Sequence, residues 1–289
     1  MNIAIIGSSP TTVLMAYKLS KRNNVTIFER SKNYGGAWSW EKHFGANVSS
    51  KTNIFEPTNI KEEISLKKVT KFFNSEFKIK PKIINASYNL HGGYSPKKLY
   101  EFDLIKIYKK ILSNSKIKIV KKKISSVDLS KKVKINKKYI FDKLYVPFFV
   151  GIKEFCIYGK KIKTDYKLIT SKHLFMVSKS RFFKKFYYSI NFNSFLDRAQ
   201  QQKKNNFFFF KARIRKKYKK YSISKLIKSC VKKNFYNKIK IAKIVKYSNY
   251  YRNNDQIKKL EKIRKKNKIY VLNTRQLVTS IYKYKLHTR

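Results

Sequence analysis

The first part of the chain alternates between strand-like and helix-like patterns, and this alternation limits the folds that the chain can adopt. An apolar run over residues 3–6 stops at Gly7, and a helical pattern follows over residues 11–21. A second apolar run, residues 25–28, ends at Glu29. A strand, a helix and a second strand in this order form a right-handed unit with two parallel strands. The pattern therefore predicts an α/β domain built on this unit.

The turn between the first strand and the helix carries part of a dinucleotide-binding pattern. In that pattern three glycines shape the turn, let a pyrophosphate approach the backbone and let the helix pack on the strand. Here the three positions hold Gly7, Ser9 and Thr12, and Pro10 leads into the helix. A helix N-terminus in this place attracts phosphate. An ordinary turn without a ligand is the alternative interpretation of the same residues.

The end of the second strand carries the acid that such units use for the ribose hydroxyls. Glu29 favours an unphosphorylated ribose, whereas the neighbouring Arg30 could accept a 2′-phosphate, which Glu29 would repel. Gly35 and Gly36 follow, with Trp38 close behind. Paired glycines let backbone amides approach a ligand, and a simple turn beside a buried tryptophan is the alternative.

These motifs together resemble a known family. The run GSSP…VTIFERSKNYGGAWSW resembles the N-terminal FAD-binding segment of FAD-dependent oxidoreductases, which include amine oxidases, protoporphyrinogen oxidases and UDP-galactopyranose mutases. Its GGxWxW form is similar to flavin-dependent monooxygenases. The resemblance implies FAD as the cofactor. It implies that the cofactor is held by Gly7, Ser9, Pro10, Thr12, Glu29, Arg30, Gly35, Gly36, Trp38 and Ile124.

Later segments continue the resemblance. A helical pattern over residues 96–112 precedes the run KKKISSVDLSKKVKINKKYIFDKLYVP, which fits a β-meander and a strand that returns to the main sheet. Ile124 would lie near the adenine. We predict an α/β fold with a Rossmann-like FAD/NAD(P)-binding domain, a β-meander and a smaller β-rich substrate domain. The predicted cofactor domain comprises residues 1–60, 95–150 and 235–289, and the substrate domain comprises residues 61–94 and 151–234.

The chain is lysine-rich. It has 70 Lys and Arg residues against 15 Asp and Glu, a formal charge of +55. Lys, Asn, Ile, Phe and Tyr share codons rich in A and T, so we interpret the excess mainly as the base composition of the genome. The lysines are spread along the chain, and no specific nucleic acid is expected. After Asp197 the only acids are Asp255 and Glu261, which leaves a nucleic-acid-binding protein as the alternative from another class.

Other residue types set further limits. Cys156 and Cys230 have no metal or redox spacing, which is typical of reduced thiols in the cytoplasm. The first apolar run is too short for a signal peptide. No apolar run approaches the length of about 18 residues that would span a membrane. No histidine has a partner at metal-ligand or triad spacing, so we predict no metal and leave the catalytic residues unassigned.

The combined prediction is a cytoplasmic FAD-dependent oxidoreductase acting on a small-molecule substrate, with the flavin supplying the redox chemistry. One alternative is a non-redox flavin mutase acting on a nucleotide sugar, for which Arg198, Arg213 and Arg215 could bind phosphate or carboxylate. Another is a catalytically inactive homologue with the same fold. It follows from the replaced turn glycines and from the lack of any glycine after Gly159, where the family carries a C-terminal Gly-Asp motif.

Overall fold

The computed structural model describes most of residues 1–272. The segments outside the described part are residues 36–38, 50–53, 56, 58–59, 86–97, 130–131, 148–151, 153, 158, 164–166, 184–186, 192, 252–254, 256–257, 259–268 and 273–289. No helix in the described part is long and apolar enough to cross a bilayer.

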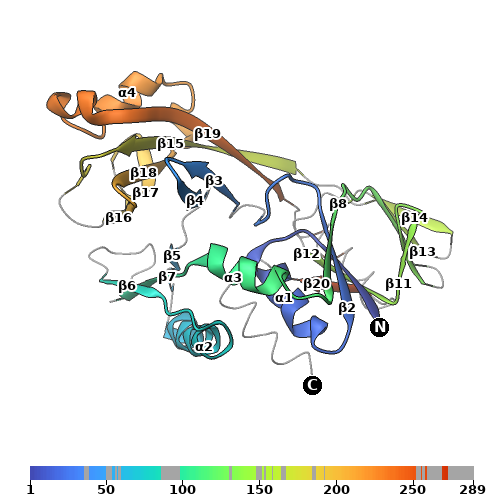
Figure 1. Ribbon diagram of the computed structural model, residues 1–289. Helices are drawn as coiled ribbons and strands as arrows, with labels where there is room; N and C mark the ends of the chain where they lie inside the picture. Colours follow the sequence, from blue (N-terminus) through green and yellow to red (C-terminus); the bar gives the residue numbers. More distant parts are fainter. Residues whose placement is uncertain are drawn as a thin grey trace.

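One of the two large sheets is a five-stranded parallel sheet. Its strand order is β20-β12-β1-β2-β8 (Figure 1). The strands are β1 (Asn2–Ile6), β2 (Asn24–Glu29), β8 (Ile117–Lys121), β12 (Lys143–Pro147) and β20 (Ile269–Leu272). β1 pairs in parallel with both β2 and β12. This central position explains why β1 is an unbroken apolar run, since both faces of a parallel sheet are covered.

Helices cover one face of this sheet. They are α1 (Pro10–Ser20), α2 (Ile60–Phe77) and α3 (Leu104–Leu112). Ile3 and Ile5 of β1 share a core with the buried faces of the three helices. α3 buries apolar residues at helical spacing and begins at Asp103, whose side chain accepts a hydrogen bond from the amide of Lys106.

A β-meander covers the other face of the parallel sheet. Its strands are β9 (Ser126–Asp128), β10 (Val133–Ile135), β11 (Tyr139–Phe141), β13 (Glu154–Ile157) and β14 (Lys160–Lys163), in the order β11-β10-β9-β13-β14. Ala4 and Ile6 alternate with the residues that face the helices, and they pack with Phe28 and Ile124 against this layer. The predicted Rossmann-like layer with a β-meander is therefore confirmed.

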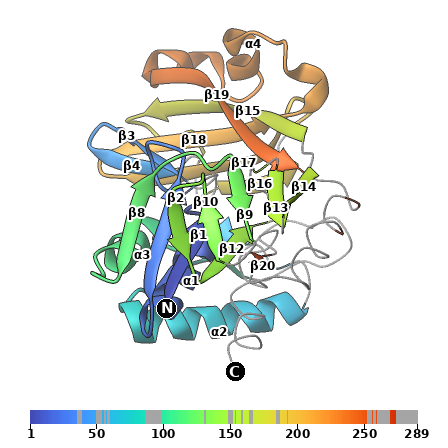
Figure 2. The same ribbon diagram turned by 90° about the vertical axis from the view of Figure 1, so that its right-hand side faces the viewer.

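A second sheet, the antiparallel sheet, has the strand order β16-β17-β18-β15-β19. Its strands are β15 (Lys167–Ser178), β16 (Tyr187–Asn191), β17 (Leu196–Lys204), β18 (Phe207–Ile214) and β19 (Ile239–Tyr251). One face packs against α4 (Ile223–Lys228), and the other carries the hairpin of β3 (Trp40–His43) and β4 (Ala46–Ser49). Figure 1 shows this hairpin on the side of the sheet turned toward the parallel sheet. Figure 2 shows α4 and α2 at opposite ends of the molecule.

A small sheet links the two larger ones, and it corrects one prediction. It has the order β5-β7-β6, formed by β5 (Ile54–Phe55), β6 (Lys82–Asn85) and β7 (Lys98–Glu101). The helical pattern predicted over residues 96–112 is wrong in its first part, because residues 98–101 form β7 between two antiparallel partners. Pairing on both sides outweighs the helical spacing of these side chains.

The sheets differ from the predicted domain division in two segments. β13 and β14 belong to the meander sheet, although residues 151–234 were assigned to the substrate domain. β19 pairs with β15 along the antiparallel sheet, although residues 235–289 were assigned to the cofactor domain. The domain boundaries themselves stay a prediction.

Candidate nucleotide-binding site

The first turn has the backbone that its sequence predicts. β1 ends at Ile6, and Gly7 adopts φ +82°, a conformation that favours glycine. A Cβ added at Gly7 would meet no heavy atom within 4 Å. The amide of Gly7 donates to the carbonyl of Phe28 at 2.8 Å, which ties the turn to the end of β2.

The two positions that lack glycine form the cap of α1 instead. Ser9 is the N-cap, and its Oγ accepts a hydrogen bond from the amide of Thr12 at 3.4 Å. The Thr12 hydroxyl donates to the Ser9 carbonyl at 2.8 Å, and Thr12 is fully buried. Pro10 occupies the first turn of the helix, where it needs no amide hydrogen. The helix therefore begins at the expected place in spite of the larger side chains.

Glu29 is buried, and its carboxylate faces the first turn. Its Oε2 accepts hydrogen bonds from the amide of Ser8 at 2.9 Å and from the Ser8 hydroxyl at 2.6 Å. Its Oε1 accepts one from the amide of Ser31 at 2.8 Å. A carboxylate offers about four acceptor positions, so one position on Oε1 remains after these three bonds. Arg30 follows Glu29 and is exposed.

Ser8 joins the turn to two further segments. The amide of Gly35, which has φ +101°, donates to the Ser8 Oγ at 3.0 Å and to its carbonyl at 3.1 Å. The hydroxyl of Tyr108 on α3 donates to the same carbonyl at 2.7 Å. Burial, followed by the nearby Glu29 carboxylate, holds the pKa of Tyr108 well above its ordinary value, so this hydroxyl keeps its proton. Gly35 therefore lies beside the Gly7 turn.

Lys121 at the end of β8 holds the loop that follows Glu29. Its ammonium group donates to the carbonyls of Ser31 and Lys32, both at 3.0 Å, and lies 3.6 Å from the centre of the Tyr34 ring. Desolvation lowers the pKa of Lys121, and the charge of Glu29 opposes this shift. Sequence reasoning missed Lys121 and Ser8. Lys121 lies here because the register of β2 and β8 pairs it with Glu29, and this register is not visible in the local sequence.

The remaining predicted site residues have different outcomes. Gly36 and Trp38 lie outside the described residues. Ile124 is buried between the parallel sheet and the meander, a short distance along the chain from Lys121. The structure thus brings Gly7, Ser9, Pro10, Thr12, Glu29 and Gly35 to one edge of the parallel sheet. Their role in holding a cofactor stays a prediction.

Two of the three candidate arginines, Arg213 and Arg215, make contacts within the described part of the chain. Arg213 forms a bidentate ion pair with Asp197 at 2.7 and 2.8 Å, and hydrogen bonding to this partner raises the pKa of Arg213. Arg215 donates to the carbonyl of Asn193, and the side chain of Arg198 lies outside the described residues. His43 lies against Glu41 and the Phe175 ring. Within the described residues no group of three or more His, Cys, Asp or Glu side chains could hold a metal.

The strand order, the meander and the antiparallel sheet together define the fold of FAD-dependent oxidoreductases. Solved structures of this class share it with the present chain. One is a proposed protoporphyrinogen oxidase from Exiguobacterium sp. 255-15, with a TM-score of 0.58 and 9% identity, covering 100% of this chain and 99% of that chain. An FAD-dependent oxidoreductase from Pseudomonas aeruginosa has a TM-score of 0.53 and 8% identity, covering 88% and 79% of the two chains.

A third similar structure is an oxidoreductase from Methanosarcina mazei, with a TM-score of 0.50 and 10% identity, covering 88% of each chain. No protein-family model matches the sequence, and no curated protein matches it. At identities this low the likeness establishes the fold and leaves activity to the residues of the site.

Proposed function

We propose that this chain is an FAD-dependent oxidoreductase that acts on a small molecule. The observation that carries the proposal is the convergence of the Gly7 turn, the Glu29 carboxylate and the Gly35 amide at the carboxyl edge of the parallel sheet. Ligands of open α/β sheets bind at this edge. The shared fold supports FAD as the ligand of this edge.

The residues present fit the adenosine half of FAD. The remaining acceptor position of Glu29 Oε1 could take a ribose hydroxyl, and the open space beside Gly7 leaves its backbone accessible. The N-terminus of α1, capped by Ser9, would face the pyrophosphate. The bound flavin would supply the redox chemistry. The chain would supply binding and orientation, with Tyr108 and Lys121 fixing the two segments beside Glu29.

One observation favours an inactive homologue as the second candidate. Glu29 already accepts three hydrogen bonds from Ser8 and Ser31, so folding does not require a ribose at this carboxylate. A nucleotide-sugar mutase has less support, because Arg213 is committed to Asp197 and is not available to a phosphate. We also propose a cytoplasmic location, based on the cysteine usage of the sequence.

The test of the proposed function is the flavin content of the purified protein. We expect absorbance between about 370 and 450 nm from a bound flavin, or saturable uptake of added FAD. Ser9→Gly should bind FAD about tenfold more tightly, because it removes a side chain where the pyrophosphate approaches the backbone. Glycine is nearly as good an N-cap as serine, so α1 should lose only a few tenths of a kcal/mol.

Ser222→Gly is the matched control for Ser9→Gly. Ser222 caps α4, where its Oγ accepts from the amide of Lys225 at 3.3 Å, and it lies on the antiparallel-sheet side of the molecule. Its FAD affinity should equal that of the wild type. The absence of FAD binding in both the wild type and Ser9→Gly would instead establish the inactive homologue.

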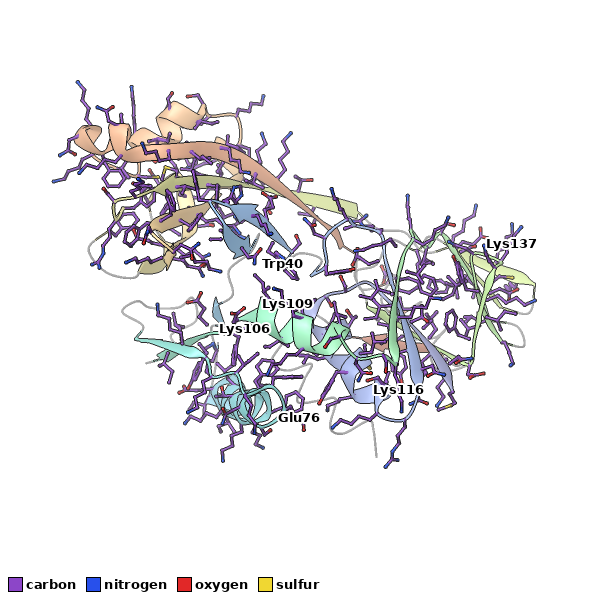
Figure 3. The ribbon with its side chains drawn as sticks, in the orientation of Figure 1. Trp40, Glu76, Lys106, Lys109, Lys116 and Lys137 are labelled. Carbon is purple, nitrogen blue, oxygen red and sulfur yellow. The ribbon has the colours of Figure 1, made fainter. Side chains whose placement is uncertain are left out.

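The basic charge leads to a separate prediction about partners. Figure 3 labels Lys106 and Lys109 on α3, Lys116 before β8 and Lys137 in the meander, so lysines lie on several separate elements of the molecule. We expect only nonspecific binding to a DNA duplex, with a Kd of about 10⁻⁴–10⁻⁶ M at physiological salt and a steep loss at higher salt. A titration with two duplexes of unrelated sequence measures this. Tight binding to one duplex alone would favour a nucleic-acid-binding function.

A further inference from the structure

A basic layer covers one face of the antiparallel sheet. This α4 layer, residues 215–238, consists of α4 and two short 3₁₀-helices, Lys216–Tyr218 and Lys233–Lys238. Its apolar side chains face the sheet, where Leu226 is fully buried and Ile227 packs against the same core. Figure 1 shows α4 on the side of the sheet away from the β3–β4 hairpin and the parallel sheet. The polar side chains of the layer therefore point to solvent.

Lysine is the main residue type on the outside of the α4 layer. Nine of the 23 residues from 216 to 238 are lysines, and eight of these lysines are exposed. None of the eight forms an ion pair within the described part of the chain. Residues 198–254 contain no Asp or Glu, and the preceding acid, Asp197, is bound to Arg213. The charge of the layer is therefore uncompensated.

The parallel-sheet side of the molecule differs, because acids are interleaved with its lysines. Examples are the ion pairs Lys21–Glu76 and Lys132–Asp142. Base composition acts along the whole gene, so it accounts for the excess of lysine but not for a layer without acids. Asp255 lies beyond the far end of β19, a 13-residue strand about 40 Å long. Repulsion within the layer is then reduced only by salt or by an anionic partner.

The aromatic side chains of the α4 layer indicate which anionic partner fits. Tyr218 and Tyr221 pack on each other and on Phe195, with centroid distances of 4.8 to 5.6 Å. The ammonium groups of Lys217 and Lys225 lie over these two tyrosine rings at 5.0 and 4.0 Å. A nucleic-acid strand needs free aromatic faces on which its bases stack, and these rings are occupied. Lysine is a point charge without the planar fork that reads bases, so the layer fits a surface of diffuse negative charge.

We propose that the α4 layer binds the surface of an anionic phospholipid bilayer. The exposed ammonium groups pair with the phosphate and carboxylate groups of the lipids. Every residue of the layer is described, and none of its large hydrophobic side chains is exposed, so charge rather than insertion holds the chain at the surface. The layer lies on the far side of the antiparallel sheet from the candidate nucleotide-binding site (Figure 1). This partner goes beyond the proposed function.

The first experiment measures sedimentation of the wild-type chain with vesicles at physiological ionic strength. The vesicles consist of phosphatidylcholine alone or of phosphatidylcholine with about 30% phosphatidylserine. We expect at least about tenfold tighter binding to the vesicles with phosphatidylserine. Most of this binding should be lost in about 0.5 M salt, where the Debye length falls to about 4 Å. Equal binding to both kinds of vesicle would overturn the proposal.

The second experiment locates the contact on the α4 layer. A triple variant combines Lys228→Gln, Lys232→Gln and Lys233→Gln, three changes at exposed side chains. A lysine near an anionic membrane contributes about fivefold in affinity, so this variant should bind the phosphatidylserine vesicles at least about tenfold more weakly. Arginine at the same three positions keeps the charge and should keep the wild-type affinity.

The matched control removes the same charge from the opposite end of the molecule. It combines Lys67→Gln and Lys71→Gln on α2 with Lys80→Gln just after it, all at exposed side chains (Figure 2). Its affinity should stay within about twofold of the wild type, because these lysines lie more than a Debye length from the bilayer. Circular dichroism checks that both triple variants are folded.

Two further results would overturn the proposal. Equal weakening by the two triple variants would show that net charge alone drives adsorption through any face. Submicromolar binding of a single-stranded oligonucleotide, lost in the α4-layer variant and unaccompanied by vesicle binding, would assign the layer to a nucleic acid, because nonspecific attraction gives only about 10⁻⁴–10⁻⁶ M.

Discussion

Glu29→Ala should lower the free energy of unfolding by at least about 3 kcal/mol, because the buried carboxylate accepts three hydrogen bonds and each bond to a charged group contributes about 1.5–3 kcal/mol. The substitution removes the acceptor of the Ser8 amide, the Ser8 hydroxyl and the Ser31 amide together. Ser8 is buried, so its amide loses its partner in a place where water does not replace it easily. Denaturant unfolding followed by circular dichroism measures the change.

Two further variants separate stability from cofactor binding. Glu29→Gln keeps the size and one acceptor oxygen, so it should lose less stability than the alanine variant while binding FAD about tenfold more weakly. Glu154→Ala is the surface control, because Glu154 forms a 3.9 Å ion pair with an exposed lysine and should change stability by no more than about 1 kcal/mol. A Glu29→Ala effect as small as this control would show that the carboxylate does not hold the turn.

Phe28→Ala should also cost about 3–5 kcal/mol, the range for removing a buried phenylalanine side chain. Phe28 is 1% exposed at the end of β2, and its ring forms T-shaped contacts with Tyr139 and Phe141 of the meander at centroid distances of 5.2 and 5.7 Å. The resulting cavity would lie between the parallel sheet and the meander, beside Ile124. Chemical denaturation measures the loss.

The meander should loosen before the rest of the chain in this variant. Hydrogen exchange of the Val133 and Ile135 amides should accelerate more than that of the Ala4 amide, because the former lie in the layer that loses the contact. Ile140→Ala on the same meander is the control, since Ile140 is 55% exposed and its removal should cost less than about 1 kcal/mol. Equal costs for the two variants would contradict the role of Phe28 as the contact between the layers.

Local patterns in the sequence were sufficient for the frame of the site. The apolar runs that end at Gly7 and Glu29 predict two adjacent parallel strands, and the structure pairs Ile3 with Val25 in that arrangement. This succeeds because a strand, its turn and the following helix are determined by neighbouring residues, and because the right-handed crossover leaves one arrangement. The meander followed in the same way from short strands separated by turn residues.

Local sequence patterns did not predict the contacts between segments that are distant along the chain. Ser8 is an unremarkable turn residue in the sequence, yet it receives Gly35 and Tyr108 from two other segments. Residues 98–101 continue a helical pattern and still form a strand, because β5 and β6 supply hydrogen-bonding partners on both sides. Tertiary pairing outweighs a local preference that amounts to at most about 1 kcal/mol per residue.

The sequence by itself determined the parallel α/β frame and the positions of Gly7 and Glu29 at one edge of it. Only the tertiary structure decided which face of the antiparallel sheet Gln200 on β17 occupies. The register of β17 and β18 shifts between Asp197 and Gln200, and a shift of one residue moves a side chain to the other face of a sheet. That shift places Gln200 opposite Lys211, a juxtaposition that depends on strand pairing and therefore leaves no mark in the local sequence.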